Sequence, residues 1–231
     1  MKPYNYPISR FSYILLNSLV LLCQCKSEQD LQQTQDLDFS RILIIGNSIT
    51  KHGPAPEIGW LGNWGMAASA REKDYFHRLK SKFESIPEHD SIILTRTVAF
   101  EASFWDFDFS RLDSLKPFEP TLIILNLGEN VDDNMASDLN YGSHLLQLIN
   151  YLREDHDITI VCVDSFWDKP AVNAQVQEIS KKEHFIFVGI SDLGTLENQA
   201  FADFENVGVG AHPNDNGMEM IAERIGEALG I

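Results

Sequence analysis

Basic residues are scarce in this 231-residue chain, where 18 Lys and Arg stand against 34 Asp and Glu and the formal net charge is −16. So acidic a chain repels a phosphate backbone unless a local basic stripe overrides the repulsion. The sequence contains no such stripe, which argues against nucleic acid as a partner. Cysteine is scarce as well, and three Cys residues cannot form a disulfide framework.

What the chain does contain is enough apolar material for one sizeable domain. Apolar residues make up 44% of the sequence and charged residues 23%, and there are fourteen Phe. This composition is ordinary for a globular protein and argues against disorder. A chain of this length buries roughly 70% of its unfolded surface, so it needs no disulfide or metal scaffold.

The N-terminus has the pattern of a targeting signal. Lys2 and Arg10 precede an apolar run over 11–22, which is long enough for a secretory signal and short for a bilayer-spanning helix. An uncleaved N-terminal anchor is the alternative. Residues 26–39 are rich in Gln, Asp, Glu and Ser and are interpreted as a flexible tether.

A cysteine at the end of the apolar run, followed by a polar acidic stretch, resembles a bacterial lipoprotein signal. Cys25 is favoured over Cys23 as the lipidated residue because the polar tether starts directly after it. The resemblance implies a signal over 1–25, a tether over 26–39 and a folded domain over 40–231. It also implies export to the bacterial cell envelope, with the membrane reached only through an N-terminal lipid anchor. If the cysteines are incidental, the protein is periplasmic or secreted.

The body of the chain alternates strand and helix patterns. Continuous runs rich in Ile, Val and Leu predict five strands, at 41–45, 91–98, 121–127, 158–164 and 184–188. Helical spacing of apolar residues between and after them predicts amphipathic helices, three of which are marked by Phe76/Leu79/Phe83, Leu145/Ile149/Leu152 and Met218/Ile221/Ile225. The order predicts a single three-layer α/β/α domain with a doubly wound, five-stranded parallel sheet. Ligands of such sheets bind at the carboxyl ends of the strands.

Three short motifs follow predicted strands or precede the last helix. Ser48 stands in Gly-Asn-Ser after the first strand, where a turn can expose its hydroxyl and neighbouring N–H groups. Asn130 stands in Gly-Glu-Asn after the third strand and can donate to an oxyanion. His212 lies on a Gly-rich loop just before the last helix, a place that suits a general base. Taken singly, each is also compatible with a plain turn, a helix cap or a surface histidine.

This ordered set resembles the SGNH hydrolases, also called GDSL-like esterases, over about 41–230. The resemblance implies a flavodoxin-like fold and a serine esterase without a cofactor, in which Ser48 is the nucleophile and His212 its base. The Ser48 backbone N–H and Asn130 would stabilise the oxyanion.

Two positions depart from the family pattern. The family has a Gly after the second strand whose N–H completes the oxyanion hole, and Ala99 lies nearest that place here. Val209 stands where the family has the Asp of its triad. Because Val cannot accept a hydrogen bond from the imidazole, the orienting partner of His212 must be another side chain, a backbone carbonyl or water.

Aromatic and acidic residues surround these motifs. Trp60 and Trp64 lie in the loop after Ser48 and either stack on a sugar ring or pack the loop onto the domain. Glu101 and Glu129 lie at strand ends and are assigned to the substrate cleft. No His-x-His or Glu-x-x-His spacing accompanies the carboxylates, so no metal is expected. Trp167 follows the fourth strand and lies either in the cleft or in the core.

The function predicted from these residues is hydrolysis of an ester through an acyl-enzyme on Ser48. The substrate is a small-molecule ester or acyl groups on a carbohydrate. The missing family Asp and Gly leave a second hypothesis open, a non-catalytic carbohydrate- or ligand-binding protein on the same fold.

Overall fold

The computed structural model describes residues 37–154 and 156–231. The predicted signal, Cys25 and most of the predicted tether lie outside the described residues. Leu37 and Phe39, which the sequence assigns to the tether, pack against one of the core clusters. The folded domain therefore includes Leu37 and Phe39, which precede its predicted start at 40.

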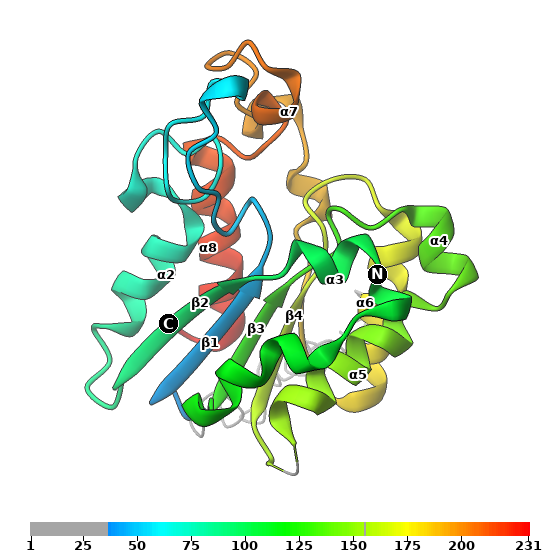
Figure 1. Ribbon diagram of the computed structural model, residues 1–231. Coiled ribbons are helices and arrows are strands. Elements are labelled where there is room, and N and C mark those ends of the chain that lie inside the picture. The colour runs from blue at the N-terminus through cyan, green and yellow to red at the C-terminus, as the bar shows by residue number, and fades with distance from the viewer. Residues whose placement is uncertain (1–36, 155) are drawn as a thin grey trace, which may run out of the picture. The chain divides into compact units, whose positions relative to one another are not determined.

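Five parallel strands form one sheet in the order β2-β1-β3-β4-β5 (Figure 1). The strands are β1 (Arg41–Gly46), β2 (Ser91–Arg96), β3 (Leu122–Asn126), β4 (Thr159–Val163) and β5 (Ile186–Val188). The helices are α2 (Tyr75–Phe83), α3 (Val98–Ala102), α4 (Asp133–Asp138), α5 (Tyr141–Arg153), α6 (Pro170–Glu183), α7 (Val207–Gly210) and α8 (Asp215–Leu229). The 3-10 helices are Pro56–Ile58, Arg71–Lys73, Phe104–Asp106, Phe109–Phe118, Ser191–Leu193 and Leu196–Asn198.

The sheet is covered on both faces, which explains why its central strands are apolar throughout. Alternate residues such as Ile42 and Ile44 point to a core closed by α2 and α8. Their neighbours Leu43 and Ile45 point to a second core closed by α5 and α6. These two cores make the three-layer, doubly wound fold that the sequence predicts.

Two strands are each two residues shorter than the sequence predicts, β2 at its end and β5 at its start. The second strand was expected to run to Val98, but β2 ends at Arg96 and Val98 starts α3. Thr97 makes the last bond to β1, donating to the Gly46 carbonyl at 3.0 Å, and the ladder stops where β1 stops. The fifth strand was expected from His184, but His184 has a φ of 60° and ends α6, so β5 begins at Ile186.

The carboxyl ends of the parallel strands share one edge of the sheet, and the chain order reverses between β1 and β3. At that switch point the segments after β1 and β3 emerge side by side, which positions a ligand site between them. Beyond this edge, the loop after β1 packs on the segment that includes α7 (Figure 1). We call their shared apolar core the cap cluster; it consists of Ala55, Trp60, Met66, Ala67, Ala200 and Val209. Over residues 37–154 and 156–231, no helix combines the length and apolar composition needed to cross a bilayer.

Candidate active site

A tight turn holds Ser48 directly after β1. The Lys51 N–H donates to the Asn47 carbonyl at 3.0 Å, and the Ser48 carbonyl accepts from the Met66 N–H at 2.9 Å. A Cβ at Gly46 would lie 1.8 Å from Thr50 Oγ1, so the turn closes this tightly only with glycine there. The Ser48 side chain is thus fixed at the carboxyl end of β1.

His212 reaches Ser48 from the loop between α7 and α8. Its Nε2 lies 2.8 Å from Ser48 Oγ, although 164 residues separate the two in the chain. The backbone of His212 is held on both sides, because its N–H donates to the Val209 carbonyl and its carbonyl accepts from the Ala200 N–H. The sequence-predicted nucleophile and base therefore form a hydrogen-bonded pair.

The Gly208 carbonyl takes the place that a triad carboxylate would occupy. It accepts from His212 Nδ1 at 2.7 Å. A carbonyl oxygen can only accept, so Nδ1 carries the proton and the Nε2 lone pair faces the Ser48 hydroxyl. Val209 is fully buried in the cap cluster and serves packing. The sequence left open whether another side chain, a backbone carbonyl or water orients His212, and in the structure the partner is a backbone carbonyl.

Burial dominates the electrostatics of His212, which is 6% exposed. Desolvation of the imidazolium lowers the pKa of His212 to about 4. The bond to the Gly208 carbonyl opposes this lowering, and the charge of nearby His52 increases it. His212 is therefore a neutral imidazole at pH 7. The indole of Trp167 stands edge-on to the imidazole at a centroid distance of 5.0 Å, and its Nε1–H donates to the Ala211 carbonyl at 2.9 Å.

Glu101 connects the segments that carry Ser48 and Asn130. Its buried carboxylate accepts from Asn47 Nδ2 at 3.0 Å, from the Gly128 N–H at 2.7 Å and from Asn130 Nδ2 at 2.7 Å. An amide nitrogen has two hydrogens, so Asn130, which is exposed, keeps one for another acceptor. Glu101 was expected in the substrate cleft; at 2% exposure it lies beneath the site and orients the Asn130 amide.

Glu129 was also expected in the substrate cleft, but it is buried at 3% exposure. Its carboxyl accepts from the Phe166 N–H at 2.6 Å and from the Trp167 N–H at 3.3 Å. Burial raises the pKa of Glu129 to about 8. The hydrogen bonds from the Phe166 and Trp167 N–H groups favour the charged form and oppose this shift. Like Glu101, it supports the site from below, by fixing the loop that carries Trp167.

The remaining predicted site residues have different surroundings. Ala99 is half-buried in the first turn of α3, where N–H groups have no acceptor within the helix. Trp60 is 3% exposed in the cap cluster and its Nε1–H donates to the His52 carbonyl, so it packs the loop and presents no open face. Trp64 is half-buried and lines a cavity. Among the described residues, no group of three or more His, Cys, Asp or Glu is arranged to hold a metal ion.

The sequence left a backbone carbonyl open as one possible partner of His212 without identifying Gly208, and it left the place of Trp167 open. A backbone acceptor has no side-chain signature, so nothing in the residue identity of Gly208 could have indicated its role. Trp167 had a positional signal, because it follows β4 at the ligand-binding edge. Its contact with His212 depends on the fold of two loops, because Trp167 and Ala211, the neighbour of His212, are 44 residues apart in the chain.

Comparison with known proteins is informative for the fold. No family model matches the chain, and no curated protein matches it. Among solved structures, LAE5, an α/β hydrolase enzyme from the metagenome of Lake Arreo in Spain, is 17% identical, with a TM-score of 0.57 over 84% of this chain and 98% of that one. An acetylxylan esterase from Geobacillus stearothermophilus is 14% identical, with a TM-score of 0.51 over 83% and 94%.

A third structure is a two-domain esterase active on acetylated mannans. It is 18% identical, with a TM-score of 0.56, and the match covers 87% of this chain but 52% of that one. At these identities the likeness shows the fold, an α/β hydrolase-like fold whose neighbours here are hydrolases and esterases.

Proposed function

We propose that this chain is a serine ester hydrolase of the SGNH type. The observation that carries the proposal is the 2.8 Å contact between Ser48 Oγ and His212 Nε2, with His212 Nδ1 bonded to the Gly208 carbonyl. A hydroxyl hydrogen-bonded to an imidazole of the correct tautomer is the arrangement that activates a serine nucleophile.

In the acylation step, Ser48 Oγ bonds to the ester carbonyl carbon while its proton passes to His212 Nε2. The tetrahedral intermediate then expels the alcohol, which takes that proton from Nε2 as the carbon–oxygen bond breaks. In deacylation, water attacks the acyl carbon and gives a proton to Nε2, and the proton returns to Ser48 Oγ when the carboxylic acid leaves.

We assign the oxyanion hole to the Ser48 N–H, the Ala99 N–H and the Asn130 side-chain amide. Support comes from the first-turn position of Ala99 and from the Asn130 hydrogen that Glu101 does not use. Donors held rigidly before the reaction stabilise the developing charge without reorganising, and Glu101 supplies that rigidity for Asn130.

An acylated carbohydrate is the substrate class we favour. Two of the structural neighbours act, by their descriptions, on acetylated mannans and on acetylxylan. Trp64, half-buried in the loop that follows the Ser48 turn, offers an aromatic surface to a sugar ring.

A fluorophosphonate serine probe tests the proposal. We expect the wild-type protein to be labelled at Ser48 and to hydrolyse p-nitrophenyl acetate, and Ser48→Ala to lose both properties without a change in thermal stability. Ser110→Ala, at an exposed serine, is the matched control and keeps labelling and turnover. A wild-type protein that neither reacts with the probe nor turns over esters would favour the non-catalytic binding protein instead.

A further inference from the structure

A cavity of about 380 Å³ adjoins the turn that carries Ser48. Its lining includes Thr50, Lys51, Trp64, Arg71, Phe76 and His77. Thr50 and Lys51 follow Ser48 by two and three residues, so the cavity begins where the nucleophile turn ends. Its volume falls within the range of about 300–1,000 Å³ that small-molecule sites occupy.

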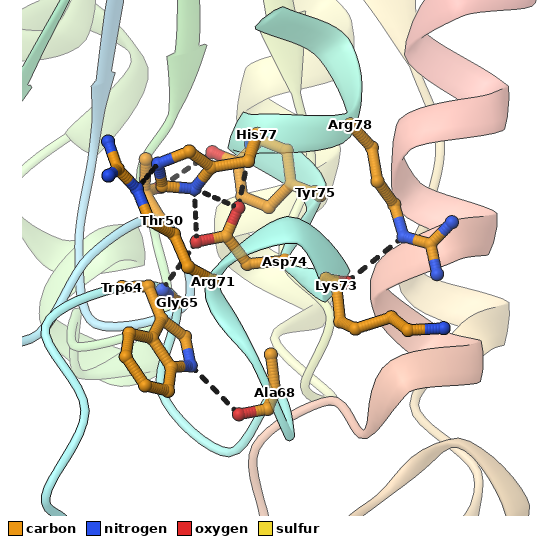
Figure 2. A network of polar contacts seen from close by, with 10 residues as sticks. All are labelled: Thr50, Trp64, Gly65, Ala68, Arg71, Lys73, Asp74, Tyr75, His77 and Arg78. Carbon is orange, nitrogen blue, oxygen red and sulfur yellow. Dashed lines mark hydrogen bonds and ion pairs between the residues drawn. The ribbon is translucent and has the colours of Figure 1, made fainter. Parts of the chain in front are cut away.

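A chain of hydrogen bonds fixes one cation of this cavity, and Figure 2 shows its members. Asp74 is fully buried at the start of α2 and accepts from the Gly65 N–H at 2.8 Å and the His77 N–H at 2.7 Å. His77 Nδ1 contacts the same carboxylate at 2.8 Å, and His77 Nε2 lies 2.6 Å from Arg71 Nε. Arginine Nε–H can only donate, so His77 Nε2 accepts and its proton is on Nδ1. His77 is therefore a neutral link between Asp74 and Arg71.

The link leaves the end of the Arg71 guanidinium free to bind. Among the described residues, only its Nε has a hydrogen-bond partner, so the two terminal nitrogens remain as donors. A guanidinium already held in one orientation loses little freedom on binding, and its planar fork matches the two oxygens of a carboxylate. Lys51 adds a second, exposed cation, and none of the described residues that line the cavity is an Asp or Glu.

The charge in the cavity differs from that of the whole chain. The net charge of −16 disfavours anions at long range, but salt screens such charges beyond about 8–10 Å. The charged residues of the described cavity lining and of the hydrogen-bond chain are Arg71, Lys51 and Asp74, and Asp74 is already bonded to backbone and imidazole N–H donors. The local balance of one positive charge matches a single carboxylate better than a doubly charged phosphate.

Aromatic surface stands beside these cations. The indole Nε1–H of Trp64 donates to the Ala68 carbonyl at 2.9 Å, and Trp60 packs edge-on against it at 5.6 Å between centroids. These contacts hold the Trp64 ring as a wall of the cavity, and Phe76 adds further aromatic surface. A rigid aromatic wall next to a fixed cation suits a ring-shaped ligand that carries an acidic group.

We propose that this cavity is a subsite for a sugar acid, a hexuronate whose carboxylate binds Arg71 and Lys51 and whose ring lies against Trp64. The proposal rests on the proposed function in one respect, because it makes the hexuronate a unit of the esterified carbohydrate on which Ser48 acts. The binding itself requires no catalysis, so it is measurable on a protein that lacks the nucleophile.

The first test titrates the Ser48→Ala protein with D-glucuronate, D-glucose and glucose 6-phosphate, which share one ring. We expect glucuronate to bind at least tenfold more tightly than glucose, by calorimetry or by the shift of the Trp64 indole N–H signal. Glucuronate that binds no better than glucose, or glucose 6-phosphate that binds more tightly than glucuronate, would overturn the proposal.

The second test removes the cations one at a time in the Ser48→Ala background. Arg71→Gln and Lys51→Gln should each weaken glucuronate binding by roughly 10-fold or more, the usual effect of losing a charged hydrogen bond. Lys73→Gln is the control, since it removes the same charge from the same 3-10 helix without lining the cavity. Equal affinities in all three variants would contradict the assignment.

The two proposals fail separately. If the serine probe does not label wild-type protein while glucuronate binds Ser48→Ala as expected, the hydrolase proposal is wrong and the binding site remains. If Ser48 is labelled and glucuronate does not bind, the subsite is wrong and the hydrolase remains.

Discussion

His212 differs from the base of a complete triad in what its Nδ1 contacts. The Gly208 carbonyl holds the tautomer in which Nε2 accepts the Ser48 proton, as a carboxylate would. It offers no full negative charge to the imidazolium that would form in the proposed reaction. A loss of about 10⁴ in kcat follows when the triad Asp is replaced and the tautomer is wrong. Because the Gly208 carbonyl keeps this tautomer, we expect kcat to be lower than that of a complete triad by less than this factor.

The pH dependence of activity follows from the burial of His212. The imidazole must be neutral to accept the Ser48 proton, and its pKa is lowered to about 4. We expect the acidic limb of kcat/KM against pH to have its midpoint near 4, whereas an ordinary histidine would put it near 6.5. Activity should therefore persist at pH 5.

A control separates His212 from its neighbour. His52→Gln removes the other imidazole close to the site and should leave an acidic limb well below 6. A limb that stays near 6.5 in the wild-type protein would contradict the assignment of His212 as a buried base.

Asn130 provides the second test at the level of a single residue. Asn130→Ala should lower kcat by about 10²–10³, the usual effect of losing one oxyanion donor. Asn134→Ala, at an exposed asparagine in α4, is the matched control and should change neither constant. If Asn130→Ala raises KM alone, the amide serves ground-state binding and the oxyanion assignment is wrong.

At the scale of elements, two buried carboxyl groups hold the loops around the site together. Glu101 in α3 ties the turn after β1 to the turn after β3. Glu129, in the turn after β3, holds the loop after β4 through the Phe166 and Trp167 N–H groups. A buried polar group is tolerated where donors satisfy it, and here the donors are backbone N–H groups and the Asn47 and Asn130 side-chain amides of the loops that must be positioned.

Glu129 makes stability depend on pH above neutrality. Its pKa is raised from 4.5 to about 8, so the folded state binds more protons than the unfolded state between these values. The contribution of protonated Glu129 is fully present below pH 4.5 and is lost as pH rises through 8. His212 titrates in the opposite sense, between 4 and 6.5. Above pH 6.5 His212 no longer changes the stability with pH, so of these two groups only Glu129 does.

Glu129→Gln tests this linkage. The variant cannot ionise, so its melting temperature should fall less between pH 6.5 and 9 than that of the wild-type protein. The difference in slope is the readout, because lost hydrogen bonds lower the stability of the variant at every pH. Parallel slopes for the two proteins would show that Glu129 is already ionised at pH 6.5.

At the scale of the whole molecule, we propose that the chain is exported and anchored by lipid at Cys25. The positive N-terminus, the apolar run over 11–22 and the acidic stretch after Cys25 support this proposal. Mass spectrometry of protein from its native host should find a lipidated N-terminus at Cys25 or Cys23. An unmodified N-terminus at Met1 in cytoplasmic protein would contradict it.

Local sequence determined the fold class. Five apolar runs and the helical spacing of Phe76/Leu79/Phe83 and similar sets predict covered parallel strands and amphipathic helices, and the structure confirms the sheet. Strand and helix periodicities are properties of neighbouring residues, so they can be read without knowing the partners. Candidate residues also follow from them, because the carboxyl ends of parallel strands meet at one edge.

Only the tertiary structure decided how those residues are supported. Ser48 and His212 were expected to pair, but the orienting Gly208 carbonyl depends on the backbone path of α7. Glu101 was assigned to the substrate cleft, but it is buried, because the turns after β1 and β3 close over it. Backbone acceptors, burial and cavities arise from contacts between segments far apart in the chain, and residue identity alone carries no record of those contacts.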